Sequence, residues 1–197
     1  MKRTTERQRG WERNSQKRCK DFRSAYLETV YAAGGVSWVF SSEDCGLELY
    51  NGRRFALITA ANPRSEAWQE ADNDQRNAEL RLEIAAKGWA FGESVGSSPS
   101  GDWREYGCLI WDAPLEAVVK IGQRYGQNAI CHGEAGRVAL VWCDDGETEW
   151  FYATAFPKFV AASPPQTWRV TAVFIFVEKK EGFFPNYDST AVSFLLA

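Results

Sequence analysis

The stretch RFALITAANPRSEAWQEADNDQRNAEL, residues 54–80, decides the fold that we expect for this chain. It opens with RFALITA, a compact apolar run of the kind found in central β-strands. Farther on, apolar side chains recur at helical spacing, and a lysine–glycine pair indicates where the helix ends. We therefore predict a strand over 54–60 and a helix over 72–87, joined by a polar loop.

The segments that follow continue this alternation of strands and helices. Further strands are predicted at 89–95, 104–112 and 128–134. Pro114 suits the first turn of a helix over 114–125. The order across 54–134 is the ferredoxin-like βαββαβ pattern. We predict an α+β fold with a mostly antiparallel sheet, in which the first and third strands of this unit are central.

Segments on both sides are expected to extend this sheet. They are a helix over about 14–32, a strand over 36–41, strands over 137–143 and 149–156, and the strand-like runs WRVTAVFIFVE and TAVSFLLA after the loop 162–167. We predict three parts: a basic segment over 1–20, a core domain over 21–142, and a C-terminal β extension over 143–197. The extension would pack on the same sheet or continue it.

Composition and charge narrow the class of protein. Of the 197 residues, 45% are hydrophobic and 25% are charged, which is typical of a globular domain. Residues 1–20 hold eight Lys or Arg against two Glu, whereas the remainder holds 15 basic and 24 acidic residues. The acidic body argues against a broad nucleic-acid interface, so such contact is expected only through residues 1–20. The alternative for that segment is a frayed tail that leads into a solvated helix.

Cysteine usage and hydropathy bear on cofactors and location. The five cysteines are odd in number and lack C-x-x-C spacing, so we expect neither a zinc site nor a redox dithiol, and no cofactor. The N-terminus lacks the apolar core of a signal peptide, and the longest apolar run, near 173–177, is far too short to cross a bilayer. We expect a cytoplasmic protein with reduced thiols and no membrane contact.

The predicted topology brings four polar segments to one edge of the sheet. The first strand of the unit ends there, its helix begins there, the loop 96–103 turns there, and the strand 128–134 begins there. The side chains that we expect to bind a ligand at this edge are Asn62, Arg64, Ser65, Asn73, Arg76, Asn77, Trp103, Gln127 and Asn128.

Two interpretations of this edge remain open. A helix N-terminus beside Arg64 and Arg76 suits a phosphate or carboxylate, and Trp103 is suited to stacking on a base or sugar. Glu105 is the one candidate for acid–base catalysis if the protein is an enzyme, which the sequence does not decide. In the alternative interpretation, Arg76 pairs with Glu105 or Asp102 and the amides bind backbone, which gives a purely structural network.

Four stretches, in this order and spacing, resemble an uncharacterised bacterial family, the domain of unknown function DUF3293. They are FALITAANPRSE, NDQRNAELRLEIAAKGW, SGDWRE and IGQRYGQNAI. The resemblance covers about residues 25–142. It implies that the following residues of the edge belong to the family's motifs: Asn62, Pro63, Ser65, Asn73, Arg76, Asn77, Trp103, Glu105, Gln127 and Asn128. It implies no activity. The chain departs from the family in its part after residue 142 and in the Tyr106–Gly107 pair.

The sequence therefore favours a small-ligand binding protein whose ligand is anionic, plausibly a nucleotide. The alternative is a protein-binding module or inhibitor that contacts a partner, or a second copy of the chain, through its aromatic C-terminal strands. His132, the only histidine, is interpreted as a structural strand residue.

Overall fold

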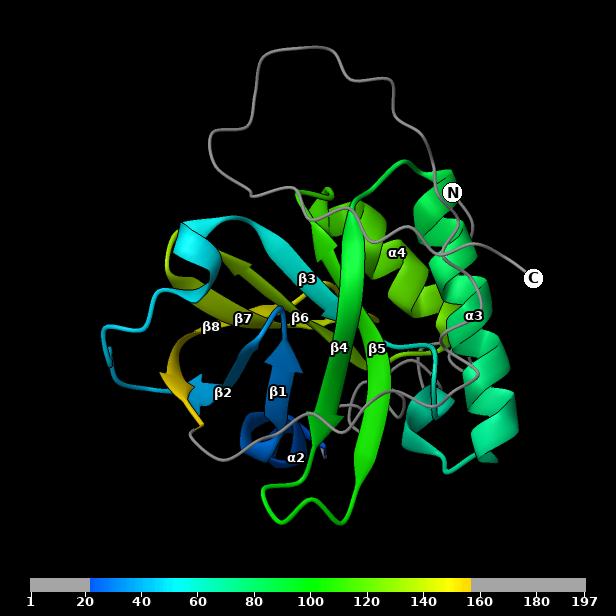
Figure 1. The fold of residues 1–197 in the computed structure, drawn as a ribbon, viewed down its shortest axis with the longest axis horizontal. Coiled ribbons are helices and arrows are strands. Elements are labelled where there is room, and N and C mark those ends of the chain that lie inside the picture. The colour runs from blue at the N-terminus through cyan, green and yellow to red at the C-terminus, as the bar shows by residue number, and fades with distance from the viewer. Residues whose placement is uncertain (1–21, 157–197) are drawn as a thin grey trace, which may run out of the picture.

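The computed structural model describes residues 22–156, within which eight antiparallel strands close into a barrel (Figure 1). The ring runs β1-β2-β8-β7-β6-β3-β5-β4, and β4 pairs with β1 to close it. The strands are β1 (Val30–Ala33), β2 (Val36–Ser41), β3 (Phe55–Ile58), β4 (Phe91–Ser97), β5 (Arg104–Trp111), β6 (Ala129–Glu134), β7 (Arg137–Trp142) and β8 (Thr148–Ala155). The helices are α2 (Arg23–Glu28), α3 (Glu70–Ala86) and α4 (Leu115–Tyr125), with 3-10 turns η1 (Leu49–Gly52) and η2 (Pro63–Ser65).

The predicted ferredoxin-like α+β fold is wrong, because the sheet is a closed barrel and not an open layer. β3 does lie between β5 and β6, but the strands at the two ends of this group are not edges. β4 pairs with β1, while β7 and β8 connect β6 to β2. The pairings that close the barrel join segments far apart in sequence, and local strand and helix patterns do not report them.

The predicted helix over 14–32 is also wrong at its C-terminal end. α2 ends at Glu28, and Thr29 is already extended, with φ −66° and ψ 134°. Residues 30–33 form β1, which pairs with β2 on one side and β4 on the other and is buried along its whole length. Val30 and Tyr31 favour a strand, and the double pairing prevails over the helical spacing of the apolar residues.

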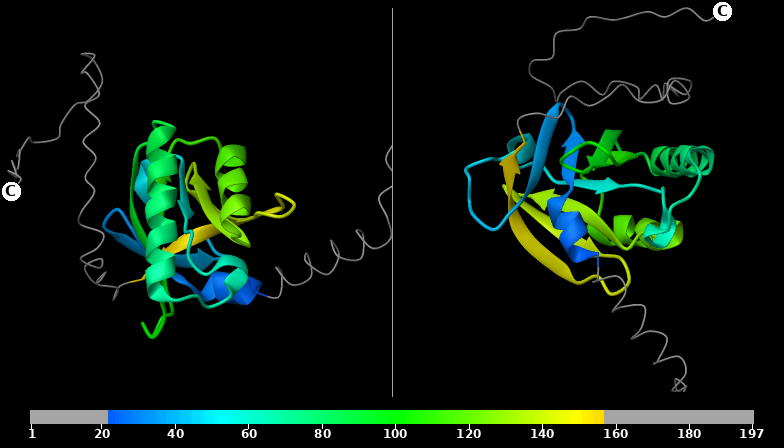
Figure 2. Two further views of the ribbon diagram at one scale, coloured as in Figure 1. Left: turned by 90° about the vertical axis from the view of Figure 1, so that its right-hand side faces the viewer. Right: turned by 90° about the horizontal axis from the view of Figure 1, so that it is seen from below.

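Side chains alternate between the inside and the outside of the barrel. In β3, Phe55 and Leu57 point inward, whereas Ala56 and Ile58 pack outward beneath the helices. α3 and α4 lie on the same side of the barrel (Figure 2) and cover this outer face through Leu80, Ile84, Val118 and Ile121, all of which are fully buried. Two hydrophobic cores result, one inside the barrel and one between the barrel and the helices.

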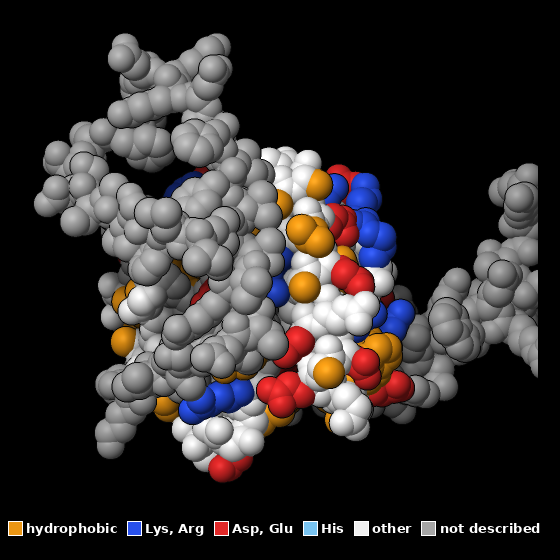
Figure 3. All heavy atoms as spheres, turned by 45° about the vertical axis from the view of Figure 1, so that its right-hand side comes forward, with side chains coloured by type: hydrophobic (Ala, Val, Ile, Leu, Met, Phe, Trp, Pro, Cys, Tyr) orange, Lys and Arg blue, Asp and Glu red, His pale blue; other side chains and the backbone are white. Residues whose placement is uncertain are grey.

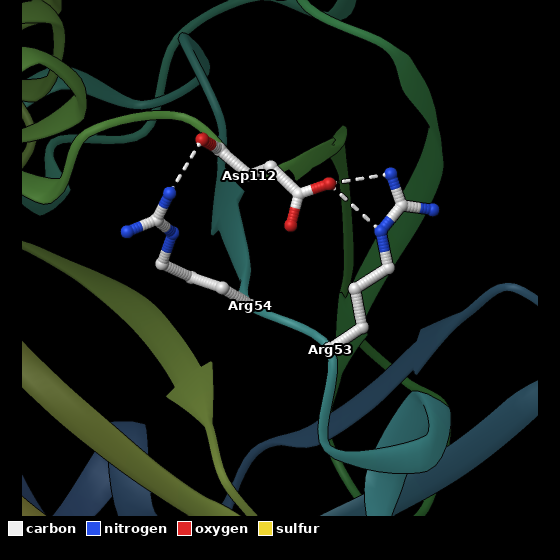
Figure 4. A network of polar contacts seen from close by, with 3 residues as sticks. All are labelled: Arg53, Arg54 and Asp112. Atoms are coloured by element: carbon white, nitrogen blue, oxygen red, sulfur yellow. Dashed lines mark hydrogen bonds and ion pairs between the residues drawn. The ribbon is translucent and has the colours of Figure 1, made fainter. Parts of the chain in front are cut away.

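A polar clasp holds β3 and β5 together at the end where β3 begins (Figure 4). Arg53 donates two hydrogen bonds to one carboxylate oxygen of Asp112, at 2.8 and 2.6 Å, and stacks on Trp111. Arg54 donates to the backbone carbonyl of Asp112 at 2.9 Å. Asp112 has a φ of 54°, a left-handed conformation that these contacts help to hold.

Most of the other predicted elements are present, with ends displaced by at most two residues. The runs WRVTAVFIFVE and TAVSFLLA and the basic segment 1–20 lie outside the described residues, so the division into three parts stays a prediction. β8, which was predicted as part of the C-terminal extension, is one of the strands of the barrel wall and pairs with β2 and β7. In the described part of the chain, no helix is long and apolar enough to cross a membrane.

Candidate functional site

A cavity of about 280 Å³ lies at the end of the barrel where β3 finishes and β5 and β6 begin. Its floor is formed by buried residues of the barrel interior, including Leu57 and Cys131. Its rim includes Trp103, whose side chain is 43% exposed. Barrels of eight strands have an interior just wide enough to be filled by side chains or to hold one small ligand.

The cavity exists because inward positions at this end carry small residues. Gly96 and Ser94 of β4 lie opposite Glu105 and Gly107 of β5, and Ala129 occupies the matching inward position of β6. The rest of the interior is filled by rings. These are Trp38, Phe40, Tyr50, Phe55, Trp111 and Phe151, which pack mostly edge to face. Tyr31 separates the two regions, because it lines the cavity and stacks on Trp38 at 4.9 Å between ring centroids.

α2 forms part of the cavity wall and is fixed to the barrel by three contacts. Tyr26 packs edge-on against Trp142, and its backbone carbonyl accepts a hydrogen bond from the Tyr31 hydroxyl at 2.9 Å. Arg23 donates to Glu149 at 2.7 Å. The helix therefore presents Tyr26 to the cavity from a defined position.

Glu105 is the one carboxyl group among the described residues that line the cavity. Burial raises the pKa of this carboxyl to about 7, and hydrogen bonds with the Asn62 and Thr59 side chains oppose part of that rise. The described lining contains no Lys, Arg or His. A carboxyl with a pKa near neutral pH, without a cationic partner and at the mouth of an apolar cavity, is typical of functional sites.

The loop that carries Asn62 into the cavity has a strained backbone. Asn62, Arg64 and Ser65 have φ angles of 45°, 60° and 56°, in the left-handed region that side-chain-bearing residues rarely adopt. Such conformations persist only where surrounding contacts hold them, and they are common at functional sites. Here Asn62 and Ser65 both line the cavity.

Arg76 provides one of the contacts that hold this loop. Its Nε donates to the carbonyl of Ala60 at 2.8 Å, and its Nη2 donates to the carbonyl of Tyr125 at 2.7 Å. The guanidinium also lies over the rings of Trp68 and Tyr125. It therefore joins the end of β3 to the end of α4 and points away from the cavity lining.

The two asparagines of α3 bind the same loop. Asn77 is 1% exposed; its oxygen accepts from the Ala60 N–H at 2.9 Å, and its nitrogen donates to the carbonyl of Tyr106 at 3.2 Å. The Asn73 oxygen accepts from the Asn62 N–H at 2.9 Å, and its nitrogen donates to the Asn62 side chain, also at 2.9 Å. Both amides thus fix backbone groups at the end of β3.

The turn between α4 and β6 completes the network. Gln127 donates to the carbonyl of Ala61, and Asn128 donates to the Ser65 hydroxyl, both at 2.8 Å. The Arg64 N–H donates to the carbonyl of Gly126 at 2.8 Å. Three segments, from the loop after β3, from α3 and from the α4–β6 turn, are therefore cross-linked by side-chain amides and one guanidinium.

Comparison with known proteins gives one match. Residues 58–130 match the model of a family described as "Protein of unknown function (DUF3293)". The match spans 73 of the 197 residues, and residues 58–130 are called the DUF3293 segment below. The resemblance inferred from the sequence motifs is confirmed, over a shorter range than the 25–142 expected from them. No curated protein and no solved structure was found to match the chain.

The DUF3293 segment contains the whole amide–guanidinium network, together with Trp103 and Glu105. It includes α3, α4, β4 and β5, whereas β1, β2, β7 and β8 lie outside it. The family motifs therefore encode the loop, the two helices and the acidic side of the cavity. The strands that close the barrel, together with α2, come from the rest of the chain.

The structure divides the residues predicted for the site into two groups. Those that line the cavity are Asn62, Ser65, Trp103, Glu105 and Gln127. Those that surround it without lining it are Arg64, Asn73, Arg76, Asn77 and Asn128. Sequence reasoning missed Tyr26, Tyr31 and Cys131, because each is a single inward residue in an apolar run. The inward alternation of β6, in which Ala129 and Cys131 share one face, was the available signal.

His132 lies outside this site. It is buried on the outer face of β6, where its ring meets Trp150 edge-on and its Nε2 is 3.7 Å from Glu134. Burial lowers the pKa of this imidazole, although nearby Glu134 opposes the change. Among residues 22–156, no group of three or more His, Cys, Asp or Glu side chains is placed to hold a metal ion.

Proposed function

We propose that this protein binds a small, largely apolar molecule in the barrel-end cavity, with Glu105 as its main polar contact. The observation that carries the proposal is the composition of the lining. Apolar and aromatic side chains form most of it, and a few convergent polar groups, Asn62, Ser65 and Glu105, lie at one side. Ligand sites in proteins generally have this composition.

The size of the cavity limits the ligand. An engineered apolar cavity of about 150 Å³ accommodates benzene, and this cavity measures about 280 Å³. A molecule of about one or two small rings, or a short branched chain, would fill it. A complete nucleotide would have to extend past Trp103 into solvent.

The anionic ligand suggested by the sequence has less support than a neutral or cationic one. Arg76 is engaged with two backbone carbonyls, and neither it nor Arg64 lines the cavity. An anion inside would face the Glu105 carboxylate without any cation among the described lining residues. On the face shown in Figure 3, acidic and basic side chains of the described residues are interspersed and do not form one basic surface.

Glu105 also remains the candidate for acid–base catalysis, should the bound molecule react. A carboxyl that titrates near neutral pH can accept and return a proton under working conditions. We further propose a cytoplasmic location, because Cys45, Cys108 and Cys131 are free thiols. The alternative function, protein binding through C-terminal strands, depends on residues outside 22–156 and stays a prediction from the sequence.

A pair of glycine variants of β4 tests the proposal. The Cβ of a residue at position 96 would point at Thr29 and the Trp103 ring, at 3.4 and 3.9 Å, so Gly96→Val fills the cavity mouth. A Cβ at position 92 meets nothing within 4 Å, so Gly92→Val is the matched control. We expect the wild type and Gly92→Val to bind the two-ring fluorescent probe 1-aminonaphthalene, which is neutral at pH 7, and Gly96→Val to lose at least tenfold in affinity.

A second measurement identifies the natural ligand. Small molecules released from the purified, denatured protein would be analysed by mass spectrometry, with Gly96→Val as the reference. A species enriched in the wild type and in Gly92→Val but absent from Gly96→Val supports the proposal. Equal probe binding by all three proteins would overturn it.

A further inference from the structure

We infer that the cavity selects an amine: a ligand with one ammonium group next to an aromatic or branched apolar body. The inference rests on the proposed function, because it assigns the chemical class of the molecule bound in the same cavity. Two independent features support it. Glu105 is the one charged group of the described lining, and aromatic rings line the same cavity.

The charge of the lining is one-sided. Of the groups that face Glu105, Tyr26 belongs to α2, Tyr31 to β1 and Cys131 to β6. Burial raises the pKa values of both tyrosines above their ordinary range and that of the Cys131 thiol to about 12, so all three are neutral at physiological pH. The loop after β3 contributes only the uncharged Thr59 and Asn62. An ionised Glu105 therefore has no counter-charge within the described lining.

A buried carboxylate without a counter-charge is unfavourable, and a ligand ammonium group supplies the missing charge. Binding an alcohol or amide would leave that charge unpaired. Binding a carboxylic acid would place a second negative charge beside it. Of these polar groups, the ammonium alone both donates a hydrogen bond to Glu105 and neutralises its charge.

Aromatic rings add a second source of selectivity. Trp103 at the rim, Phe22 and Tyr26 on the α2 side, and Tyr31 at the boundary with the ring cluster all line the cavity. Cations are attracted to the faces of such rings, and tryptophan gives the strongest attraction. Aromatic side chains grouped around a ligand are one way in which proteins recognise organic ammonium ions.

The charge of Glu105 makes the selectivity depend on pH. The burial that raises the pKa of Glu105 to about 7 leaves the carboxyl mostly protonated at pH 5.5 and mostly ionised at pH 8. An alkylamine stays protonated at both pH values. Its affinity should therefore rise about tenfold from pH 5.5 to pH 8, whereas the affinity of a neutral analogue should stay constant or fall.

Three probes of one shape test the inference: 2-phenylethylamine, 2-phenylethanol and 3-phenylpropionate. Their affinities for the full-length chain would be measured by calorimetry in phosphate buffer, with intrinsic tryptophan fluorescence as a second readout. At pH 8 we expect the amine to bind at least tenfold more tightly than the alcohol, and the carboxylate to bind most weakly. Glu105→Gln should reduce the preference for the amine over the alcohol to less than threefold.

The outcomes separate this inference from the proposed function. If the alcohol binds as tightly as the amine, and Gly96→Val blocks both, the amine inference is overturned and the binding cavity stands. If the carboxylate binds most tightly, the inference is overturned in favour of the anionic class. If none of the three probes binds at millimolar concentration, both the inference and the proposed function fail. Gly92→Val, which keeps the cavity open, is expected to behave as the wild type in every arm.

Discussion

Arg76 reaches across from α3 and donates to the backbone carbonyl of Tyr125, at 2.7 Å, at the end of α4. A second bond from the same guanidinium ends on the carbonyl of Ala60. Of the two interpretations of the polar edge, Arg76 therefore fits the structural network, although its partners are backbone carbonyls and not the carboxylates of Glu105 or Asp102. The residues of the DUF3293 motifs thus divide into those that shape the cavity and those that line it.

Replacing Arg76 should affect stability more than binding. Arg76→Ala leaves two carbonyls without their charged donor, so we expect a loss of about 2–4 kcal/mol in the free energy of unfolding. Urea denaturation measures this loss. Arg124→Ala, which removes an exposed ion pair with Glu83, is the control and should cost less than about 1 kcal/mol. A stable Arg76→Ala protein that fails to bind the neutral probe would contradict the structural assignment.

Asn77 should be among the polar residues of α3 whose loss costs most. Asn77→Ala leaves the Ala60 N–H without its acceptor and removes one of the donors to the Tyr106 carbonyl. Because this region is buried, we expect the free energy of unfolding to fall by about 2–4 kcal/mol. Gln75→Ala on the exposed side of α3 should change the unfolding free energy by less than about 0.5 kcal/mol. Asn77→Asp, which keeps the acceptor for Ala60 but turns the donor toward Tyr106 into a second acceptor, should be as damaging as alanine at pH 8.

The charge of Glu105 should make stability depend on pH. Its pKa in the fold, about 7, lies above the ordinary 4.5, so the folded protein binds the proton more tightly than the unfolded chain does. The resulting stabilisation is fully present below pH 4.5 and is lost as pH rises through 7. Solvent in the open cavity limits the effect to about 1–2 kcal/mol.

Glu105→Gln isolates this contribution. We expect the variant to be more stable than the wild type at pH 8, by about 1–2 kcal/mol, and equal to it at pH 4.5. Glu93→Gln, an exposed carboxyl of β4, is the control and should leave the pH profile unchanged. Thermal unfolding followed by circular dichroism from pH 4 to pH 8 measures both. Parallel profiles for the wild type and Glu105→Gln would mean that Glu105 is not buried in the cavity.

Gly107 should tolerate no side chain, in contrast to Gly96 on the neighbouring strand β4. A Cβ at position 107 would lie 2.5 Å from the carbonyl oxygen of Ile58, which is fixed backbone of β3. We expect Gly107→Ala to cost about 2–4 kcal/mol through strand displacement. Gly96→Ala, with its nearest contact at 3.4 Å, should cost less than about 1 kcal/mol. Equal losses for the two variants would contradict the β3–β5 register.

This register explains a departure that the sequence alone left open. The Tyr106–Gly107 pair differs from the bulkier apolar continuation expected for the family. At position 107 the backbone of β3 passes too close for a side chain, and at position 106 the carbonyl accepts hydrogen bonds from Asn77 and Thr59. Both residues thus help to join β5 to the end of β3.

Local patterns predicted the elements well and the closure of the sheet poorly. The helices α3 and α4 were predicted from the helical spacing of their apolar residues and from the glycine that follows each of them. The strands were predicted from short apolar runs. The pairing of β1 with β4 has no such signal, because Val30–Ala33 continues the apolar spacing of the preceding helix. A strand as short as β1 can be assigned only once the strands that pair with it on both sides, β2 and β4, are known.

The site was predictable to the extent that it depends on connectivity. The loop after β3, the start of α3, the segment around Glu105 and the α4–β6 turn do meet, because each follows or precedes a strand at the same end. Which polar groups face inward was not predictable. That depends on whether Arg76 finds two carbonyls, and on the small residues Gly96 and Ala129 that leave the cavity open.

The closed ring of strands also limits how chains can associate. Each strand within residues 22–156 has hydrogen-bonded neighbours on both sides, so this part of the chain offers another polypeptide no strand with a wholly unpaired edge. Cross-β aggregation and strand exchange between molecules both begin at such unpaired backbone. For this part of the chain they require a prior local opening of the barrel, and the β1–β2 and β3–β6 pairings, with three residue pairs each, are the shortest junctions at which that opening can start.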